Sequence, residues 1–224
     1  ISGSAPLLAQ THQAFENRTG HRILERYGLT ETSMNTSNPL TGLRKPGTVG
    51  MPLPDVDLRI DHAYPGAAGE IQVKGPNVFK GYWGLKEKTA DAFTTDGYFR
   101  TGDLGEIDAD GYVTIVGRSK DLIISGGLNI YPKEIETVID AQPEVDESAV
   151  IGLPDPDFGE RVIAIVVETT KGAVDPVALK NVLAQSLAKY KLPKEIVTID
   201  NLPRNSMGKV MKKDLRDLIS QKRF

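Results

Sequence analysis

The stretch Gly117-Arg118-Ser119-Lys120-Asp121 separates two parts of the 224-residue chain that have different patterns. Short strand-like segments joined by glycine-rich turns precede it. Strand and helix patterns alternate after it, as in a sheet covered by helices. We therefore expect a mixed α/β protein. Residues 1–118 would be the end of a large, strand-rich domain, residues 119–224 a small α+β domain, and Lys120 the hinge between them.

The composition argues against several classes of protein. The net charge is −3, and acidic and basic residues are intermixed, so the sequence offers no basic surface for nucleic acid. No apolar run is long enough to span a bilayer. The lack of cysteine excludes disulfides and thiolate catalysis, and it fits a cytoplasmic protein. The three histidines, His12, His21 and His62, are expected at the surface, which argues against a histidine-dependent hydrolase.

The amino-terminal residues predict a helix followed by a strand. Ser4 is a possible N-cap, and Gly20 is placed to end the helix. Residues 21–27 have the pattern of a strand. Position 1 is isoleucine and no leader-like segment opens the chain, so we expect it to be the later part of a longer polypeptide.

The segment Tyr27-Gly28-Leu29-Thr30-Glu31-Thr32 presents hydroxyls and a carboxylate where a strand breaks at a glycine. Threonine hydroxyls donate hydrogen bonds to phosphate oxygens, and a glutamate oxygen is a suitable hard ligand for Mg²⁺. The same spacing also suits a helix cap, in which Thr30 and Glu31 begin a helical turn. The residues alone leave both interpretations open.

A β-meander is expected next, with strands at 56–60 and 70–73, a short helix at 85–93 and turns that include Gly102-Asp103. A carboxylate displayed by a glycine turn can accept hydrogen bonds from both hydroxyls of a ribose. The alternative is that Asp103 only completes the turn, which is the more frequent role of a Gly-Asp pair.

Beyond the hinge the pattern predicts four strands, at 122–124, 148–153, 162–167 and 195–199. Helices are expected to begin at Pro132 and after Asp175, and a last short helix to cover 215–219. Lys209 lies on a polar loop between the last strand and that helix. A lysine in such a loop is ordinarily a solvated cation.

In their order, these segments resemble the acyl-adenylate-forming (AMP-binding) superfamily of acyl- and aryl-CoA synthetases, luciferases and peptide-synthetase adenylation domains. The segments that carry the resemblance are Ser2–Leu7, Tyr27–Thr32, Gly69–Trp83, Tyr98–Leu104, Gly117–Glu136 and Ser206–Lys209. The family's earlier phosphate-binding loop is absent. The resemblance therefore covers the last part of a large nucleotide-binding domain and the entire small domain.

The resemblance implies a nucleotide site in the upstream part. The residues that would line the adenine slot are Gly3, Ser4, Ala5 and Tyr27. Asp103 would bind the ribose 2′- and 3′-hydroxyls, and Arg118 would also contact ribose. Lys120 matches the pivot position, where aspartate is common in the family and lysine occurs in many acyl-CoA synthetases.

The resemblance also implies the groups that act on the phosphates and on CoA. Thr30 would hold the α-phosphate, and Glu31 would hold Mg²⁺. Lys209 would bridge the substrate carboxylate and the α-phosphate. Gly126 and Gly127 would flank the pantetheine tunnel of CoA when the thioester forms.

Within the family, the chain is most similar to the malonyl-CoA synthetases. The segments that indicate this are residues 31–39, 44–47 and 126–134. Malonate is a dianion, so a second cation must face its distal carboxylate, and the fork of an arginine suits that task. We expect Arg44 to fill this role with Met34 on the pocket wall, although Arg44 could equally be a solvated turn residue.

The expected activity is ligation of malonate, or methylmalonate, to CoA with ATP, which gives malonyl-CoA, AMP and pyrophosphate through an acyl-adenylate. One alternative is a CoA ligase for another short-chain or aryl acid, and another is a non-catalytic nucleotide-binding fragment. The chain alone is expected to have little activity without the preceding part of the same protein. A lysine acetyltransferase acting on Lys209 is a possible further partner, because acetylation would remove its charge.

Overall fold

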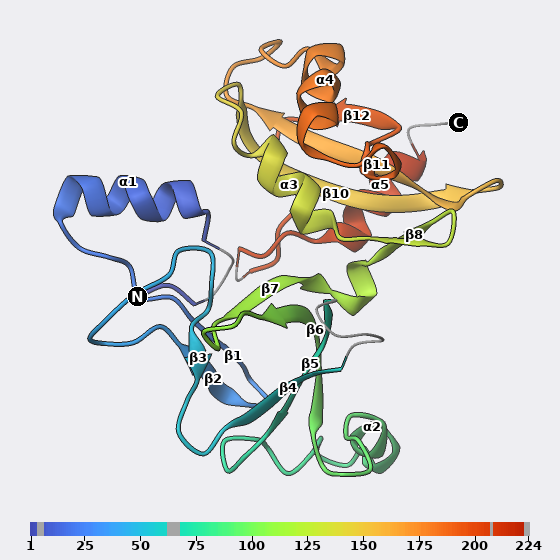
Figure 1. The fold of residues 1–224 in the computed structure, drawn as a ribbon. Coiled ribbons are helices and arrows are strands. Elements are labelled where there is room, and N and C mark those ends of the chain that lie inside the picture. Colours follow the sequence, from blue (N-terminus) through green and yellow to red (C-terminus); the bar gives the residue numbers. More distant parts are fainter. Residues whose placement is uncertain (4–6, 62–67, 207, 222–224) are drawn as a thin grey trace. The chain divides into compact units, whose positions relative to one another are not determined.

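The computed structural model describes residues 1–3, 7–61, 68–206 and 208–221, which form a mixed α/β structure. The chain divides into two compact units, Ile1–Ser119 (unit 1) and Lys120–Phe224 (unit 2), whose elements are labelled in Figure 1. Among the helices in the described ranges, none has both the length and the apolar character needed to cross a membrane.

The first half of unit 1 carries a helix and a small sheet. Helix α1 (Ala9–Thr19) ends at Gly20, whose φ of 72° is the left-handed conformation that glycine adopts readily at a helix end. The described strands β1 (Arg26–Leu29), β2 (Ser33–Ser37) and β3 (Met51–Pro52) form an antiparallel sheet in that order. The hairpin between β1 and β2 is the part of this sheet that displays Thr30 and Glu31.

The second half of unit 1 is the predicted meander. Strands β4 (Asp57–Asp61), β5 (Gly69–Lys74), β6 (Phe99–Ile107) and β7 (Val113–Arg118) lie in sequence order and pair antiparallel, and α2 (Lys86–Asp91) lies between β5 and β6 in the chain. The side chains of Tyr27, Ile71, Val73 and Val113 form a buried cluster. This cluster joins the two sheets of the unit, because Tyr27 comes from β1 and the others come from the meander.

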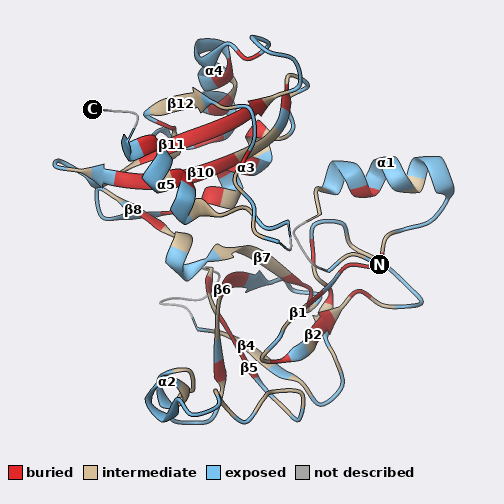
Figure 2. Ribbon diagram, turned by 180° about the vertical axis from the view of Figure 1, so that it is seen from behind, coloured by how far each residue is buried: buried red, intermediate tan, exposed pale blue. Residues whose placement is uncertain are grey.

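Unit 2 is built on a central hairpin of long strands. Strand β10 (Val145–Asp155) pairs antiparallel with β11 (Gly159–Glu168). The other edge of β11 pairs with β8 (Ile123–Ser125) at one end and in parallel with β12 (Glu195–Thr198) at the other. Strand β9 (Leu128–Ile130) completes the described sheet by pairing with β8. Figure 2 shows that β10 and β11 are mostly buried along their length.

Apolar residues cover both faces of this sheet. Helices α3 (Pro132–Ile139) and α4 (Pro176–Ser186) contribute to one cluster, and α5 (Lys212–Gln221) contributes to the other. Asp175 caps α4, since its side chain accepts a hydrogen bond of 2.9 Å from the backbone N–H of Val177. Unit 2 therefore has a hydrophobic core of its own.

The structure corrects three local predictions. His12 is not a surface residue: it is 1% exposed, and its Nδ1 lies 3.2 Å from Glu25 Oε1. His21 is exposed, and His62 lies outside the described residues. Gly102-Asp103 is not a turn but lies inside β6, at a bulge in its pairing with β5. The strand expected at 21–27 begins only at Arg26.

Candidate functional site

Residues at the beginning of the chain lie beside β1. The backbone of Ser2 donates to Leu24 O at 2.9 Å and accepts from the N–H of Arg26 at 3.0 Å. A side chain at Gly3 would come within 3.1 Å of Arg26, so the small residue permits this close approach. Gly3 is thus near the start of the strand that carries Tyr27, whereas Ser4 and Ala5 lie outside the described residues.

A buried carboxylate links the two sheets of unit 1. The hydroxyl of Tyr27 donates to Asp103 Oδ2 at 2.6 Å, and Arg118 Nε lies 2.8 Å from Asp103 Oδ1. The bulge at Gly102, whose φ is 70°, occurs where β6 presents Asp103 to Arg118 on the neighbouring strand. The structure therefore brings together three of the predicted nucleotide-binding residues from three strands.

The environment of Tyr27 favours its neutral form. Burial raises the pKa of the Tyr27 hydroxyl, and the negative charge of Asp103 and the hydrogen bond to that carboxylate raise this pKa further. The hydroxyl is consequently a proton donor to Asp103 throughout the neutral pH range. A carboxylate has about four acceptor positions, so Asp103 can accept further hydrogen bonds besides these two contacts.

Thr30, Glu31 and Thr32 form the turn of the β1–β2 hairpin and not the start of a helix. The N–H of Thr32 donates to Leu29 O at 3.2 Å, which closes the turn, and Thr30 is exposed. The helix-cap alternative is therefore wrong, because the chain continues directly into β2. The turn presents the Glu31 side chain to a pocket in the same unit.

This pocket has a volume of about 420 Å³ and combines groups of both charges. The charged and hydroxyl-bearing side chains that line it are Glu31, Glu70, Tyr82, Lys88, Asp91, Arg100, Thr101 and Arg118. It brings Glu31 and Arg118, two predicted site residues, to one surface hollow. Nothing in the sequence interpretation assigned a role to Tyr82, although the Gly81-Tyr82 pair lies in a segment that carried the family resemblance.

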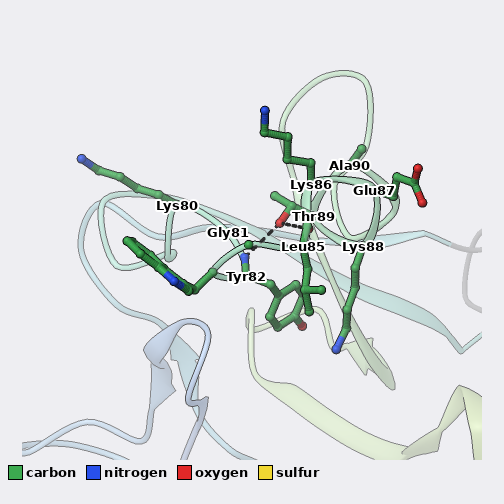
Figure 3. Close-up of a pocket in the computed structure, with 11 residues that line it drawn as sticks. Lys80, Gly81, Tyr82, Leu85, Lys86, Glu87, Lys88, Thr89 and Ala90 are labelled. Atoms are coloured by element: carbon green, nitrogen blue, oxygen red, sulfur yellow. Dashed lines mark hydrogen bonds between the residues drawn. The ribbon is translucent and has the colours of Figure 1, made fainter.

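A second pocket, of about 890 Å³, is lined by residues 80–90 and shares Tyr82 and Lys88 with the first. Figure 3 shows the Tyr82 backbone N–H bonded to the Thr89 hydroxyl, a bond of 2.9 Å. The Thr89 hydroxyl in turn donates to Leu85 O at 2.8 Å. The loop before α2 is thus tied to the helix at Tyr82.

Arg44 lies in the loop between β2 and β3, and its guanidinium binds backbone carbonyls. Its Nε, Nη1 and Nη2 donate to Pro39 O at 3.1 Å, Arg22 O at 2.6 Å and Leu40 O at 2.9 Å. A guanidinium has five N–H groups, so these bonds leave one N–H on each terminal nitrogen. Met34 lies on β2 opposite Gly28 and is partly buried.

In unit 2, Lys209 is exposed on a turn that is stabilised by hydrogen bonds between the Lys209 backbone and Asn205. The Lys209 N–H donates to Asn205 Oδ1 at 2.9 Å, and the Asn205 N–H donates to Lys209 O at 3.0 Å. Arg204 adds a bond of 2.6 Å from Nη1 to Gly208 O and an ion pair to Glu147 on β10. The turn is therefore fastened to the central hairpin of the unit.

The other predicted residues near the join and in unit 2 are also exposed. Lys120 belongs to a short 3-10 helix, Ser119–Asp121. Gly126 and Gly127 have φ values of 58° and 78° and make the tight hairpin turn between β8 and β9. Because both angles are in the left-handed region, residues with side chains would be strained at this turn.

A single carboxylate, that of Glu31, is the candidate protein ligand for a Mg²⁺ ion. In the part of the chain that the structure describes, no group of three or more histidine, aspartate or glutamate side chains is arranged to hold a metal ion. Mg²⁺ in nucleotide sites is commonly held by one or two carboxylates together with phosphate oxygens and water. Glu31, partly buried at the edge of a pocket that also contains Arg118, suits such a role.

Comparison with known proteins identifies relatives of both parts of the chain. The family model "AMP-binding enzyme" matches residues 1–83, and the model "AMP-binding enzyme C-terminal domain" matches residues 134–209. A malonate–CoA ligase of Arabidopsis thaliana is 44% identical over 96% of this chain and 38% of its own length. An indoleacetate–CoA ligase of Aromatoleum aromaticum is 43% identical over 93% of this chain and 42% of its own length. The chain thus spans less than half of these relatives.

Solved structures also identify relatives of this chain. ATP-bound MatB from Rhodopseudomonas palustris is 54% identical with a TM-score of 0.94, covering 99% of this chain and 45% of that one. Apo MatB from the same organism is 55% identical with a TM-score of 0.74, covering 99% and 46%. The first family model lies within unit 1 and the second within unit 2, whereas the two MatB structures match residues of both units.

Proposed function

Because the chain belongs to the AMP-binding enzyme family, we propose that it is the later part of an ATP-dependent malonate–CoA ligase, which could also accept methylmalonate. The observation that carries this proposal is the 44% identity to a malonate–CoA ligase over 96% of the chain. The TM-score of 0.94 to ATP-bound MatB supports it. The products would be malonyl-CoA, AMP and pyrophosphate.

In the first half-reaction, a carboxylate oxygen of malonate attacks the α-phosphorus of ATP. A bond forms between these atoms, the bond to the bridging oxygen breaks, and pyrophosphate leaves. Two anions must approach each other, so cations and hydrogen-bond donors are needed around the α-phosphate. We assign these tasks to the ammonium of Lys209, which would contact both reactants, and to the hydroxyl of Thr30.

The nucleoside would be held by residues of unit 1. Asp103 would accept hydrogen bonds from both ribose hydroxyls, while Tyr27 and Arg118 fix its two oxygens. Tyr27 and Gly3 would border the adenine, together with the proposed adenine-slot residues Ser4 and Ala5. The preorganised contacts of Asp103 support this assignment, because a carboxylate that is already oriented loses little freedom on binding.

Glu31 is the proposed protein ligand of Mg²⁺, which, when bound beside the phosphates, would neutralise their charge and that of the departing pyrophosphate. In the described structure the Glu31 carboxylate borders the 420 Å³ pocket.

In the second half-reaction, the sulfur of CoA attacks the acyl carbonyl and the thiol proton is released to solvent. The carbon–sulfur bond forms, the bond between the acyl carbon and the phosphate oxygen breaks, and AMP leaves. Lys209 must then withdraw, and rotation about a hinge at Lys120 would achieve this without dismantling the site. We propose that unit 2 is the mobile domain and that Gly126 and Gly127 then flank the pantetheine. The ATP-bound and apo structures of MatB match this chain with TM-scores of 0.94 and 0.74, so the two structures of that protein differ from each other.

Arg44 and Met34 remain our candidates for the malonate pocket. Arg44 keeps one N–H on each terminal nitrogen beyond its three carbonyl contacts, and these could meet the distal carboxylate. If so, Arg44→Gln should raise the KM for malonate while the KM for a monoanionic acid such as acetate stays unchanged.

The cytoplasmic location of the protein and the acetylation of Lys209 also stay predictions.

The experiment uses the intact protein with a panel of acids. Malonate-dependent formation of AMP should require Mg²⁺ and CoA and should exceed the rates with acetate, benzoate and indoleacetate. A clear preference for one of those acids would replace malonate with another substrate, a reading that the indoleacetate–CoA ligase relative supports. AMP binding without turnover of any acid would favour the non-catalytic alternative.

A further inference from the structure

Three contacts connect the segment Asn77–Tyr82 to the hairpin turn that carries Glu31. Asn77 Nδ2 donates to Thr32 O at 2.8 Å, and the backbone N–H of Phe79 donates to Glu31 O at 2.7 Å. The third contact reaches the side chain, since the Tyr82 hydroxyl lies 3.3 Å from Glu31 Oε1. The segment therefore fixes both the backbone and the carboxylate of Glu31.

Tyr82 is itself held on several sides. Its backbone N–H donates to the Thr89 hydroxyl at 2.9 Å, as Figure 3 shows. The ring of Phe79 packs edge-on against its ring with a centroid separation of 4.9 Å. The Lys88 ammonium lies 4.3 Å from the centroid of the Tyr82 ring, at the distance of a cation–π contact. The position of the hydroxyl is thus set by its surroundings and not by Glu31 alone.

The direction of the hydrogen bond follows from the chemistry of the two groups. The hydroxyl of Tyr82 points at Glu31 Oε1, and a tyrosine hydroxyl is protonated near neutral pH because its ordinary pKa is about 10. An ionised carboxylate only accepts hydrogen bonds. Tyr82 therefore donates to Oε1, which restricts rotation of the carboxylate and leaves Oε2 available to a cation.

We propose that Tyr82 is a positioning residue that holds the Glu31 carboxylate in the orientation in which it binds the Mg²⁺ of the nucleotide. This inference rests on the proposed function, in which Glu31 is the ligand of that ion. Tyr82 acts through Glu31 and does not itself touch the metal. The same arrangement explains why a tyrosine, and not only an aromatic ring, occupies this position next to the pocket.

The test measures metal binding directly in the intact protein. Tyr82→Phe retains the ring and its contacts with Phe79 and Lys88 and removes only the hydroxyl. Electron paramagnetic resonance of Mn²⁺, in the presence of a non-hydrolysable ATP analogue, should show about three- to tenfold weaker metal binding, as expected for the loss of one hydrogen bond to a charged group. Affinity for the analogue without metal should not change.

The matched control is Tyr98→Phe, which removes another tyrosine hydroxyl that donates to a carboxylate, that of Asp57, in the same unit. It should bind Mn²⁺ as the wild type does. In a Glu31→Gln background, Tyr82→Phe should have no further effect.

Equal Mn²⁺ affinity in Tyr82→Phe and wild type would overturn the inference, and so would a wild type that binds no Mn²⁺ beside the analogue. The proposed function is judged separately, by malonate-dependent AMP formation in the wild type.

Discussion

At the scale of single residues, Asp103 is the group with the most defined surroundings in the candidate site. It is 4% exposed and contacts a neutral donor, Tyr27, and a cation, Arg118. Removal of either contact would leave part of a buried carboxylate without a partner, which is unfavourable. The arrangement explains why a charged side chain is tolerated between two sheets.

The Tyr27–Asp103 contact predicts a dependence of stability on alkaline pH. The pKa of Tyr27 is raised above 10.0 in the folded chain. The unfolded chain would therefore lose this proton first, so the stability contributed by the neutral hydroxyl is complete below about pH 10 and falls as the pH rises further. Denaturant unfolding of wild type and Tyr27→Phe between about pH 8 and 11 should show a difference that shrinks above pH 10. A constant difference would contradict this.

Sequence reasoning at this scale named Asp103, Arg118, Tyr27 and Glu31, and the structure brings the first three into contact. It predicted a turn at Gly102-Asp103, but these residues lie at a bulge within a strand. A glycine before an aspartate is typical of a turn, and a strand bulge can have the same local sequence pattern. It missed Tyr82, whose contact with Glu31 spans 51 residues of chain. Such a contact is set by tertiary packing, which residue spacing does not encode.

At the scale of elements, the β1–β2 hairpin depends on glycine at position 28. A Cβ atom there would lie 1.8 Å from Ser33 O, a backbone atom that cannot move without breaking the hairpin. We expect Gly28→Ala to lower the free energy of unfolding by about 3 kcal/mol, the upper end of the usual cost of overpacking. Denaturant titration measures this.

Gly117→Ala is the control for that substitution. Nothing lies within 4 Å of a Cβ at Gly117. Alanine is ordinarily more stable than glycine in a strand, so Gly117→Ala should leave stability unchanged or slightly raised. Equal losses in the two variants would show that the close approach at Gly28 has no energetic consequence.

The turn that carries Lys209 gives a second prediction for an element. Glu147 pairs with Arg204, which also binds Gly208 O, so the pair fastens the turn to β10. In the intact protein, Glu147→Gln should slow malonate-dependent ATP–pyrophosphate exchange roughly two- to tenfold, because a displaced lysine is less well aligned. Thioester formation from supplied malonyl-adenylate should not change.

Glu134→Gln serves as the comparison for Glu147→Gln. Glu134 is also paired with a cation, Lys191, in unit 2, but on α3. Glu134→Gln should leave both half-reactions unaffected. A similar slowing of both half-reactions in both variants would mean that Glu147 acts through general stability.

The elements of unit 2 were predicted better than those of unit 1. Residues 162–167 are apolar throughout and all buried, so composition alone predicted a buried strand there. Strand β2 was missed because its buried residues include Asn35 and Thr36, which do not produce a hydrophobic pattern. Asn35 Oδ1 accepts a hydrogen bond from Asn77, and the Thr36 hydroxyl donates to Val49 O. Local sequence does not reveal these contacts, because both partners come from other segments.

At the scale of the whole molecule, each unit has its own hydrophobic clusters, and the join lies at exposed Arg118, Ser119 and Lys120. Limited digestion of this chain with trypsin should therefore cut first at Arg118 or Lys120, since exposed joins between compact units are preferred cleavage sites. Mass spectrometry of the early fragments would identify the bond. First cleavage within β10 or β11 would contradict the proposed hinge.

Family membership was readable from sequence because it depends on the order of several short motifs and not on any single one. The identity of the acid substrate was harder to predict from sequence, since the proposed contact by Arg44 requires a guanidinium that also binds three carbonyls. The sequence shows that Arg44 carries a charge, but it does not show how many of its N–H groups already donate to backbone carbonyls.

The most direct test of the account compares Lys209→Ala with Lys213→Ala, an exposed lysine on α5, in the intact protein. Lys209→Ala is expected to reduce malonate-dependent ATP–pyrophosphate exchange by a factor of about 100 or more, because one cation aligns both reactants and stabilises the charge of the transition state. Thioester formation from supplied malonyl-adenylate should persist in both variants. Unchanged exchange in Lys209→Ala would show that this ammonium does not act in adenylation.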